Sequence, residues 1–400
     1  MAINPIARVS VDMTMDNGAV VNLAEGDIVR GLKYRSSGKT ITVDGAVRVI
    51  NAVTKVKNTN TAVCIHEPYL HEYITVQSII LDSSDEFDSE LNTIQIASII
   101  SIDSVEKNAG AITVGSGSQF KPLVDIIADA PAGSTIKLMS GTYDANMDLN
   151  KDIKIIGDGT VELVGTINIK KTTNGGEMVR PNIHLEGLTL SDKANVNIDG
   201  AKEFTLKNCV IGGFTPEVST QPIHFLNSSP DPIMVTIEDN EFLANNDKCY
   251  NLINIYGKFM DGSSISRNTF RKGCSTHNII SFFAVDDGAT VYFNDNYCEK
   301  SANMVHIQIP GEPKCTVMME NNRYDETDAN VNDAGLFLVQ PFEAKTTTYK
   351  DVNIYVNNTT KPEGQLGYVW MHGKNTQLTD EQMPSVYVDG VKTDLPVYHV

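Results

Sequence analysis

A short motif that recurs about every 28 residues is the feature of this sequence that most constrains its fold. Each copy contains a short apolar strand, an asparagine, and then an apolar or aromatic residue, and the five copies span residues 205–210, 235–242, 265–270, 291–298 and 317–324. The asparagines of successive copies are 32, 28, 28 and 26 residues apart. Propeller blades are longer, at about 40 residues, so the repeat favours the coils of a parallel β-helix, with two or three short strands in each coil.

The repeated asparagines predict a ladder inside that β-helix. Stacked coils place equivalent residues about 4.8 Å apart, and amide side chains there can hydrogen-bond the turn backbone and one another. We expect the ladder to contain Asn240, Asn268, Asn296 and Asn322, beside a column of Phe242, Phe270, Cys298 and Tyr324. Asn208 is one residue out of step with its strand, which leaves the first rung open. A second strand series lies between the copies, at residues 224–226, 252–255, 279–282, 304–307 and 336–338.

The N-terminal part of the chain has a different pattern. Short β-rich segments are separated by turn signals such as Ser37-Gly38 and Asp44-Gly45. They predict a small antiparallel β domain over residues 1–107, followed by a second domain over residues 108–400, with a hinge near Asn108-Ala-Gly110. The acidic run at residues 82–90 is expected to be a solvated loop.

A helix is predicted at the start of the second domain. Phe120, Leu123, Val124 and Ile127 recur at the spacing of one helical face, after Ser118 as a candidate N-cap. The helix is expected to end at Pro131-Ala-Gly133.

The residues after this helix carry a resemblance to a known family. The order is A-P-A-G-S-T-I-K-L at residues 130–138, S-G-T-Y at 140–143 and D-I-K-I-I-G-D-G at 152–159. This order resembles the start of the right-handed parallel β-helix in the pectate-lyase-like superfamily, where an amphipathic helix covers the first coil and hides its edge strands. The resemblance implies a right-handed parallel β-helix with an N-terminal capping helix, and together with the small antiparallel β domain before it the predicted fold is all-β. From Gly364 the repeat fades, and we expect a C-terminal cap.

The catalytic motifs of β-helix enzymes are missing. Of the polygalacturonase motifs only Asp286-Asp287 is present, and an exposed turn explains it. The motifs of alginate epimerases and pectin esterases, the phosphate-binding loops and the G-x-S-x-G nucleophile elbow are all absent. We therefore expect no catalytic or cofactor-binding residues.

One acidic column could still form a carboxylate pair. Asp239 and Asp295 precede ladder asparagines and are expected two coils apart, about 9.6 Å by the strand spacing, which is near the upper limit for an inverting glycosidase. Arg267 is expected between them and would keep both carboxylates ionised, which is wrong for a general acid. The sequence thus favours a surface stack of acid, base and acid.

A metal site is not expected either. Residues 64–72 contain His66, Glu67, His71 and Glu72, but the spacing differs from H-E-x-x-H and Pro68 would break such a helix. A turn between strands is the simpler interpretation. The six cysteines never occur as C-x-x-C and are interpreted as reduced, packed thiols.

Charge restricts the partners. The formal net charge is −18, from 32 basic and 50 acidic residues, which argues against nucleic acid or an anionic membrane as a partner. No apolar run is long enough to span a bilayer, and no secretory signal is evident, so we expect maturation in a cytoplasm.

Residues 30–57 form a local exception to the acidic charge of the chain, with seven basic residues and Asp44 as the sole acid. Arg30, Lys33, Arg35 and Lys39 are therefore candidates for docking an acidic protein, with solvated strands as the alternative.

Together these features resemble bacteriophage virion proteins, namely head decoration proteins, head fibres and tailspikes. The resemblance implies a non-enzymatic capsid decoration or attachment protein in the virion, with the major capsid protein or another virion protein as its partner. The alternatives are a tailspike-type polysaccharide depolymerase and a glycan-binding solenoid that recognises a host-surface glycan. The sequence leaves the oligomeric state open.

Overall fold

The chain is described from a computed structural model. The structure describes residues 11–23, 28–36, 38–42, 46–56, 60–67, 72–76, 95–106, 111–115, 122–130, 132–191, 195–212, 221–226, 231–245, 249–301, 303–327, 335–339, 348–361, 368–372, 382–393 and 397–398. The chain divides into two compact units, Met1–Gly141 and Thr142–Val400. The hinge expected at residues 108–110 lies outside the described residues, so that boundary stays a prediction.

The N-terminal unit contains an eight-stranded, mostly antiparallel sheet. Its order is β10-β3-β6-β7-β8-β9-β4-β5. The strands are β3 (Ile28–Arg30), β4 (Lys33–Ser36), β5 (Lys39–Thr42), β6 (Ala46–Val56), β7 (Asn60–Glu67), β8 (Glu72–Val76), β9 (Gln95–Ser101) and β10 (Ser104–Glu106). Only β8 and β9 pair in parallel. A separate hairpin joins β1 (Val11–Thr14) to β2 (Val20–Leu23). The acidic run at 82–90 lies outside the described part of the chain.

Two long sheets of stacked coils follow, and both are parallel apart from one terminal hairpin. The first has eighteen strands: β11 (Ala111–Val114), β12 (Ser134–Asp144), β14 (Ile153–Val164), β18 (Asn182–Glu186), β19 (Thr189–Ser191), β21 (Glu203–Lys207), β22 (Val210–Ile211), β24 (Met234–Glu238), β25 (Glu241–Phe242), β27 (Ser264–Ser266), β28 (Thr269–Phe270), β30 (Ala289–Tyr292), β31 (Tyr297–Ser301), β33 (Cys315–Glu320), β34 (Arg323–Thr327), β36 (Val352–Asn357), β38 (Ser385–Val388) and β39 (Val391–Thr393).

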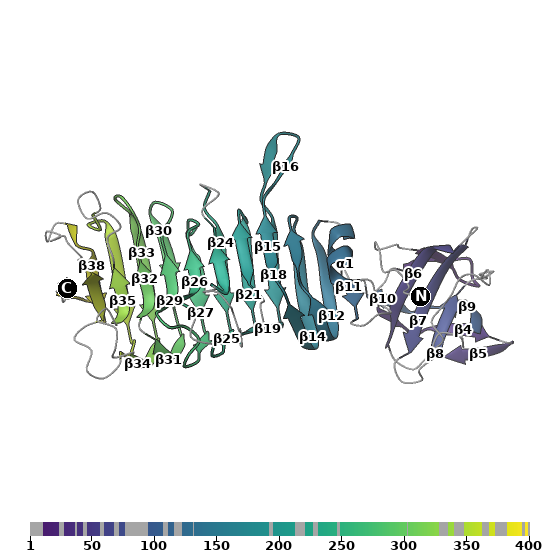
Figure 1. Ribbon diagram of the computed structural model, residues 1–400. Helices are drawn as coiled ribbons and strands as arrows, with labels where there is room; N and C mark the ends of the chain where they lie inside the picture. The colour runs from purple at the N-terminus through teal and green to yellow at the C-terminus, as the bar shows by residue number, and fades with distance from the viewer. Residues whose placement is uncertain are drawn as a thin grey trace. The chain divides into compact units, whose positions relative to one another are not determined.

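The second sheet has ten strands: β13 (Met147–Leu149), β15 (Ile167–Lys170), β20 (Val196–Asp199), β23 (Ile223–Phe225), β26 (Asn251–Ile255), β29 (Asn278–Phe282), β32 (Asn303–Ile307), β35 (Gly335–Val339), β37 (Val369–His372) and β40 (Val397–Tyr398). A typical coil contributes two strands to the first sheet and one to the second, as β24, β25 and β26 do. Figure 1 shows these coils side by side in chain order. The structure therefore confirms the predicted all-β fold, an antiparallel β unit followed by a parallel β-helix.

The core of the β-helix consists of side chains that alternate along each strand. In β18 and β21 the residues at every second position are buried, among them Ile183, Leu185, Phe204 and Leu206. Phe204 meets Phe225 of the second sheet edge to face, with ring centroids 5.5 Å apart. Because every coil buries the same positions, equivalent apolar residues stack on one another through the solenoid.

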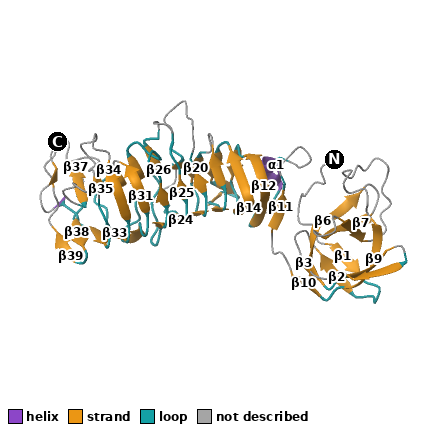
Figure 2. Cartoon of the chain, turned by 90° about the horizontal axis from the view of Figure 1, so that it is seen from below, coloured by secondary structure: helices purple, strands orange, loops and turns teal. Residues whose placement is uncertain are grey.

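The predicted helix forms, but its buried face is shifted. α1 (Leu123–Asp129) lies beside β11 and β12, and follows Pro122, which makes no side-chain cap (Figure 2). Ser118 and Phe120 lie outside the described residues. Leu123, Ile126 and Ile127 are buried, whereas Val124, placed on the buried face by the sequence, is 38% exposed. The prediction for Val124 was wrong because the spacing i, i+3, i+4 also fits the neighbouring face, which includes Ile126.

The C-terminal end differs from the expected cap. The repeat was predicted to fade from Gly364, yet β37 and β40 extend the ten-stranded sheet, and β38 pairs in parallel with β36. β39 then folds back on β38 as an antiparallel strand. No described helix is long and apolar enough to cross a membrane.

A hairpin of β16 (Thr172–Asn174) and β17 (Glu177–Val179) leaves the coil between β15 and β18. Figure 1 shows it standing away from the stacked strands. Arg180, at its base, donates to the carbonyl oxygens of Ala201 and Pro232, both at 2.6 Å. These bonds fix the base of the hairpin to the following coils.

Candidate functional site

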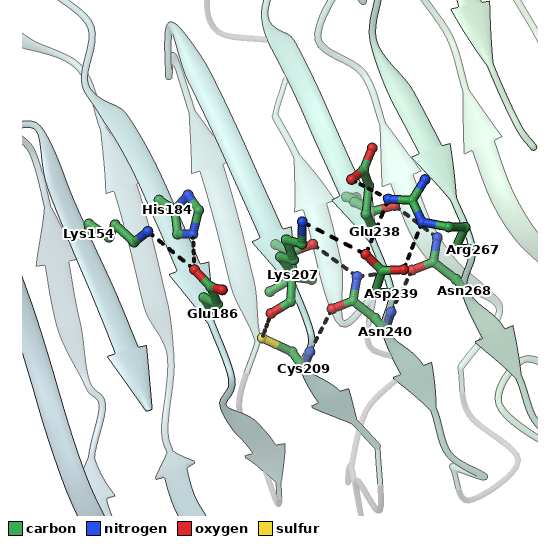
Figure 3. Close-up of polar contacts among 12 residues, drawn as sticks. Lys154, His184, Glu186, Lys207, Cys209, Glu238, Asp239, Asn240, Arg267 and Asn268 are labelled. Atoms are coloured by element: carbon green, nitrogen blue, oxygen red, sulfur yellow. Dashed lines mark hydrogen bonds and ion pairs between the residues drawn. The ribbon is translucent and has the colours of Figure 1, made fainter. Parts of the chain in front are cut away.

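The inner asparagines form a continuous ladder through four coils (Figure 3 shows Asn240 and Asn268). The Asn268 side-chain oxygen accepts hydrogen bonds from the backbone N–H and the Nδ2 of Asn240, at 3.1 and 3.0 Å. Asn268 Nδ2 donates to the Ile237 carbonyl at 2.9 Å and to Asn296 Oδ1 at 3.1 Å. Asn296 and Asn322 repeat the pattern. These amides are buried and fully hydrogen-bonded, so they hold coils together and offer nothing to a ligand.

Other residue types occupy the two ends of the ladder. The first rung, which the sequence left open, is Cys209, whose backbone N–H donates to Asn240 Oδ1 at 2.9 Å. Asn208 instead occupies the turn position before it, with φ of 52°. At the other end, Thr359 Oγ1 accepts from the backbone N–H of Asn322 at 3.3 Å. Burial raises the pKa of Cys209 to about 12, as expected of a packed, unreactive thiol.

The aromatic column lies next to the ladder. The rings of Phe242 and Phe270 stack with centroids 5.0 Å apart, and Cys298 and Tyr324 follow in register. All four side chains are buried. This column therefore belongs to the core.

The acidic column is arranged differently from the sequence prediction. Arg267 Nε donates to Asp239 Oδ1 at 2.8 Å, and its Nη2 donates to Glu238 at 2.6 Å (Figure 3). Asp295 instead accepts from Asn321 Nδ2 at 3.1 Å. The expectation that Arg267 serves both carboxylates is corrected: its guanidinium turns back toward the preceding coil. The Arg267 guanidinium lowers the pKa of Asp239, which opposes a role as general acid.

The turn that carries this column has a left-handed backbone in each coil from Asn208 to Asn358. Residues at the equivalent position have positive φ, namely Asn208, Asp239, Arg267, Asp295, Asn321 and Asn358. Asparagine and aspartate tolerate this region, whereas arginine does so at a cost of about 1 kcal/mol. The two ion pairs of Arg267 therefore offset part of the cost of its left-handed backbone.

A second polar group lies on the outer face of the eighteen-stranded sheet, nearer the start of the solenoid (Figure 3). Glu186 accepts a hydrogen bond from His184 Nε2 at 2.8 Å, and Lys154 Nζ lies 3.3 Å from the same carboxylate. Burial lowers the pKa of His184, and the hydrogen bond from His184 lowers the pKa of Glu186. The Glu186 carboxylate thus has a hydrogen bond from His184 and an ion pair with Lys154, an arrangement typical of a structural contact between neighbouring strands.

The ten-stranded sheet contains a polar face that sequence reasoning missed. In β26, β29 and β32 all five residues are buried, whereas buried and half-exposed residues alternate in β20 and β23. A second amide ladder runs through Asn251, Asn278 and Asn303, with bonds of 2.8 and 2.9 Å. The spacings of 27 and 25 residues between these asparagines were a signal available in the sequence.

The same face contains a serine and a histidine at hydrogen-bond distance. Ser281 Oγ lies 2.7 Å from Nδ1 of His306. A hydroxyl beside an imidazole is the arrangement of an activated nucleophile. However, Ser281 has no exposed surface, so its oxygen cannot meet a substrate from solvent. The pair therefore links two coils.

Aromatic side chains border this buried polar face. Tyr250 stacks on His277 with centroids 4.4 Å apart, and Tyr256 stacks on Phe283 at 4.3 Å, both nearly parallel. Since these rings lie against each other, the faces in contact are not available to a ligand. The pairs stabilise the stacking of coils.

The remaining acidic and histidine candidates lie at a turn of the solenoid and around the β7–β8 connection. Asp286 and Asp287 precede Gly288, a turn residue with φ of 80°, and Asp287 is exposed. β7 and β8 pair as antiparallel neighbours, and residues 68–71 between them, with His71, lie outside the described residues. Among the residues with described side chains, no three histidine, cysteine or acidic groups gather where a metal ion could bind.

The basic candidates lie on three consecutive strands of the N-terminal sheet, β3, β4 and β5. Lys33, Arg35 and Lys39 lie on the β4–β5 hairpin and are exposed. Arg30 is exposed at the end of β3, three residues before Lys33, and β3 and β4 pair in turn with β10 and β9. Arg35 also contacts Asp16 at 3.5 Å. The structure thus brings three of the four candidates together on one hairpin.

Comparisons with protein-family models, with curated proteins and with solved structures find no match to this chain. Its class is therefore defined by its own fold, an antiparallel β unit followed by a parallel β-helix.

Proposed function

We propose that this chain is a non-enzymatic structural protein of a bacteriophage particle, of the capsid decoration or head attachment type. Its N-terminal unit docks on the major capsid protein or another virion protein, and its β-helix, of the pectate-lyase-like type, projects outward. The observation that carries the proposal is the exposed basic hairpin of Lys33, Arg35 and Lys39 in a chain with net charge −18. The step from this architecture to a virion is an analogy of fold.

The acidic side chains of the solenoid support a binding role over catalysis. Glycoside hydrolysis needs one carboxylic acid that stays protonated near neutral pH. Asp239 instead has a lowered pKa because of Arg267. Arg271 likewise contacts Glu241 and Glu299, both at 2.7 Å. These carboxylates are used in ion pairs along the surface.

The proposal is tested by following the protein through particle purification. The expected result is that the protein co-purifies with complete particles at a fixed copy number, and that particles from a deletion strain lack it. A protein that stays in the soluble fraction of the lysate would contradict the proposal.

The depolymerase alternative is tested separately with bacterial capsular polysaccharide. We expect no release of reducing ends or unsaturated sugars, with or without calcium. Depolymerisation that is lost in an Asp239→Asn, Asp295→Asn, Asp286→Asn or Asp287→Asn variant would favour the tailspike alternative instead.

A further inference from the structure

The basic hairpin lies at an edge of its sheet. β5 is the last strand in the order of the eight-stranded sheet, and β4 is its sole partner among the described strands. An edge strand presents unpaired backbone N–H and C=O groups that can pair with another strand. Position in the sheet and charge therefore coincide at β5.

The turn geometry shows which backbone groups point outward. Ser36 and Lys39 pair directly across the hairpin, and two residues form the turn between them. In such a hairpin the pair next to the turn exchanges both hydrogen bonds, and bonded and non-bonded pairs then alternate. The backbone groups of Thr40 and Thr42 consequently point away from β4.

On one face of the hairpin, β4 carries long basic side chains and β5 carries short ones. Arg35 pairs with Thr40, and Lys33 pairs with Thr42, so each pair shares a face of the sheet. All four side chains are exposed. The methylene stem of Lys33 can extend over the short threonines and place its charge beyond β5, whereas the exposed Arg35 guanidinium lies 3.5 Å from Asp16 and would exchange that contact for a carboxylate of the partner.

The positive charge at the β5 edge favours pairing with a segment of opposite charge. A second copy of β5 would bring like charges together, and lysine at a sheet edge commonly prevents self-pairing in this way. An extended segment with carboxylates, in contrast, gains both the backbone hydrogen bonds and the charge attraction. We propose that the N-terminal unit binds an acidic, extended segment of its partner protein, which adds to β5 as a further strand.

This inference rests on the docking role proposed above, but its test needs no particle. The probe is a fluorescent peptide of about eight residues, the length of a typical strand, that alternates glutamate with valine. Its binding to the full-length chain is measured by fluorescence anisotropy at low salt. Hydrogen exchange of the Thr40 and Thr42 amides is followed with and without the peptide.

Two variant pairs separate charge from backbone pairing. Lys33→Glu/Arg35→Glu is matched by Lys350→Glu/Lys392→Glu, which changes the net charge equally at exposed residues of the solenoid. Thr40→Pro removes an outward N–H, and Thr40→Val keeps it. A peptide methylated on every backbone nitrogen keeps the charge but has no N–H to donate along either edge, so it cannot add as a strand and serves even if Thr40→Pro fails to fold.

We expect the peptide to bind, and exchange at Thr40 and Thr42 to slow on binding. Affinity should fall about tenfold or more in Lys33→Glu/Arg35→Glu and in Thr40→Pro, and with the methylated peptide, but not in the two controls. The proposal is overturned if the wild-type chain does not bind, if the methylated peptide binds equally well, or if the solenoid control loses as much affinity. A chain that binds the peptide but is absent from particles would contradict the proposed function alone.

Discussion

Each inner asparagine of the β-helix joins two coils through one side chain. Its position was predictable because the same residue type recurs in copy after copy, as at Asn240 and Asn268. Cys209 and Thr359 were not identified as ladder ends, because a different residue type fills the same backbone position. The partner of Arg267 was also mispredicted, since column spacing does not say toward which coil a long side chain turns.

Loss of one central asparagine should be costly. Asn268→Ala removes the side-chain acceptor of the Asn240 backbone N–H and the side-chain donor to the Ile237 carbonyl in a buried region. We expect the free energy of unfolding to fall by about 2–4 kcal/mol. Asn353→Ala, at a half-exposed strand position of β36, is the matched control and should change it by less than about 0.5 kcal/mol. Urea denaturation of both variants measures the difference, and equal effects would contradict the ladder's role.

The ion pair of Arg267 predicts a small effect with a defined pH dependence. Because Arg267 lowers the pKa of Asp239 in the folded state, the pair stabilises the fold above the unfolded-state pKa of about 3.9, and this stability is lost as the pH falls through the lower folded value. Both side chains are partly exposed, so Arg267→Asn should change stability at pH 7 by less than about 1 kcal/mol, partly offset by relief of the left-handed backbone.

The comparison variant is Arg271→Asn, which loses ion pairs of similar length but has no left-handed backbone to relieve. It should be the more destabilising of the two at pH 7. Denaturation at pH values from 3 to 7 measures the effect, and an NMR titration should show the pKa of Asp239 rising in Arg267→Asn. An unchanged Asp239 titration would show that the ion pair does not set its protonation.

At the scale of elements, the strands of the solenoid were predictable, and the surfaces that cover them were not. The period of the repeat specifies which segments pair, because the same alternation of buried residues recurs in each coil. The outer face of β26, β29 and β32 is buried by contacts that no strand pattern reveals, such as that of Phe283, which lies outside the strands and meets His306 of β32. The face of α1 was misassigned at Val124, because seven helical residues are too few for periodicity to distinguish two adjacent faces.

The buried face of α1 can be tested with two residues of the same helix. Ile127 is 2% exposed and Val124 is 38% exposed. Ile127→Asp places a charge in an apolar environment and should lower the free energy of unfolding by several kcal/mol. Val124→Asp should be nearly neutral. Thermal melts of both variants measure this, and equal melting temperatures would show that the two faces are assigned wrongly.

At the scale of the whole molecule, the two sequence patterns, short β-rich segments and then a repeat of about 28 residues, correspond to two kinds of sheet, one mostly antiparallel and one parallel. That division followed from periods of the chain alone. The sequence periods did not reveal which class of protein this chain belongs to, because the same solenoid serves many functions and no relative was found to narrow them.

The two parts of the chain should fold separately. A fragment of residues 111–400 retains β11, α1 and all strands of the two long sheets. We expect it to melt cooperatively, because its coils bury their own apolar residues. Circular dichroism of this fragment checks the expectation, and an aggregated or unfolded fragment would show that residues 1–110 are needed for the solenoid.

Particle capture tests the proposed docking most directly. Particles that lack this protein are mixed with the full chain, with residues 1–110 or with residues 111–400, and the bound protein is quantified after sedimentation. The account predicts that the full chain and the N-terminal fragment bind, that binding weakens as salt rises, and that Lys33→Glu/Arg35→Glu reduces it. Capture of residues 111–400 alone, with no binding of residues 1–110, would contradict it.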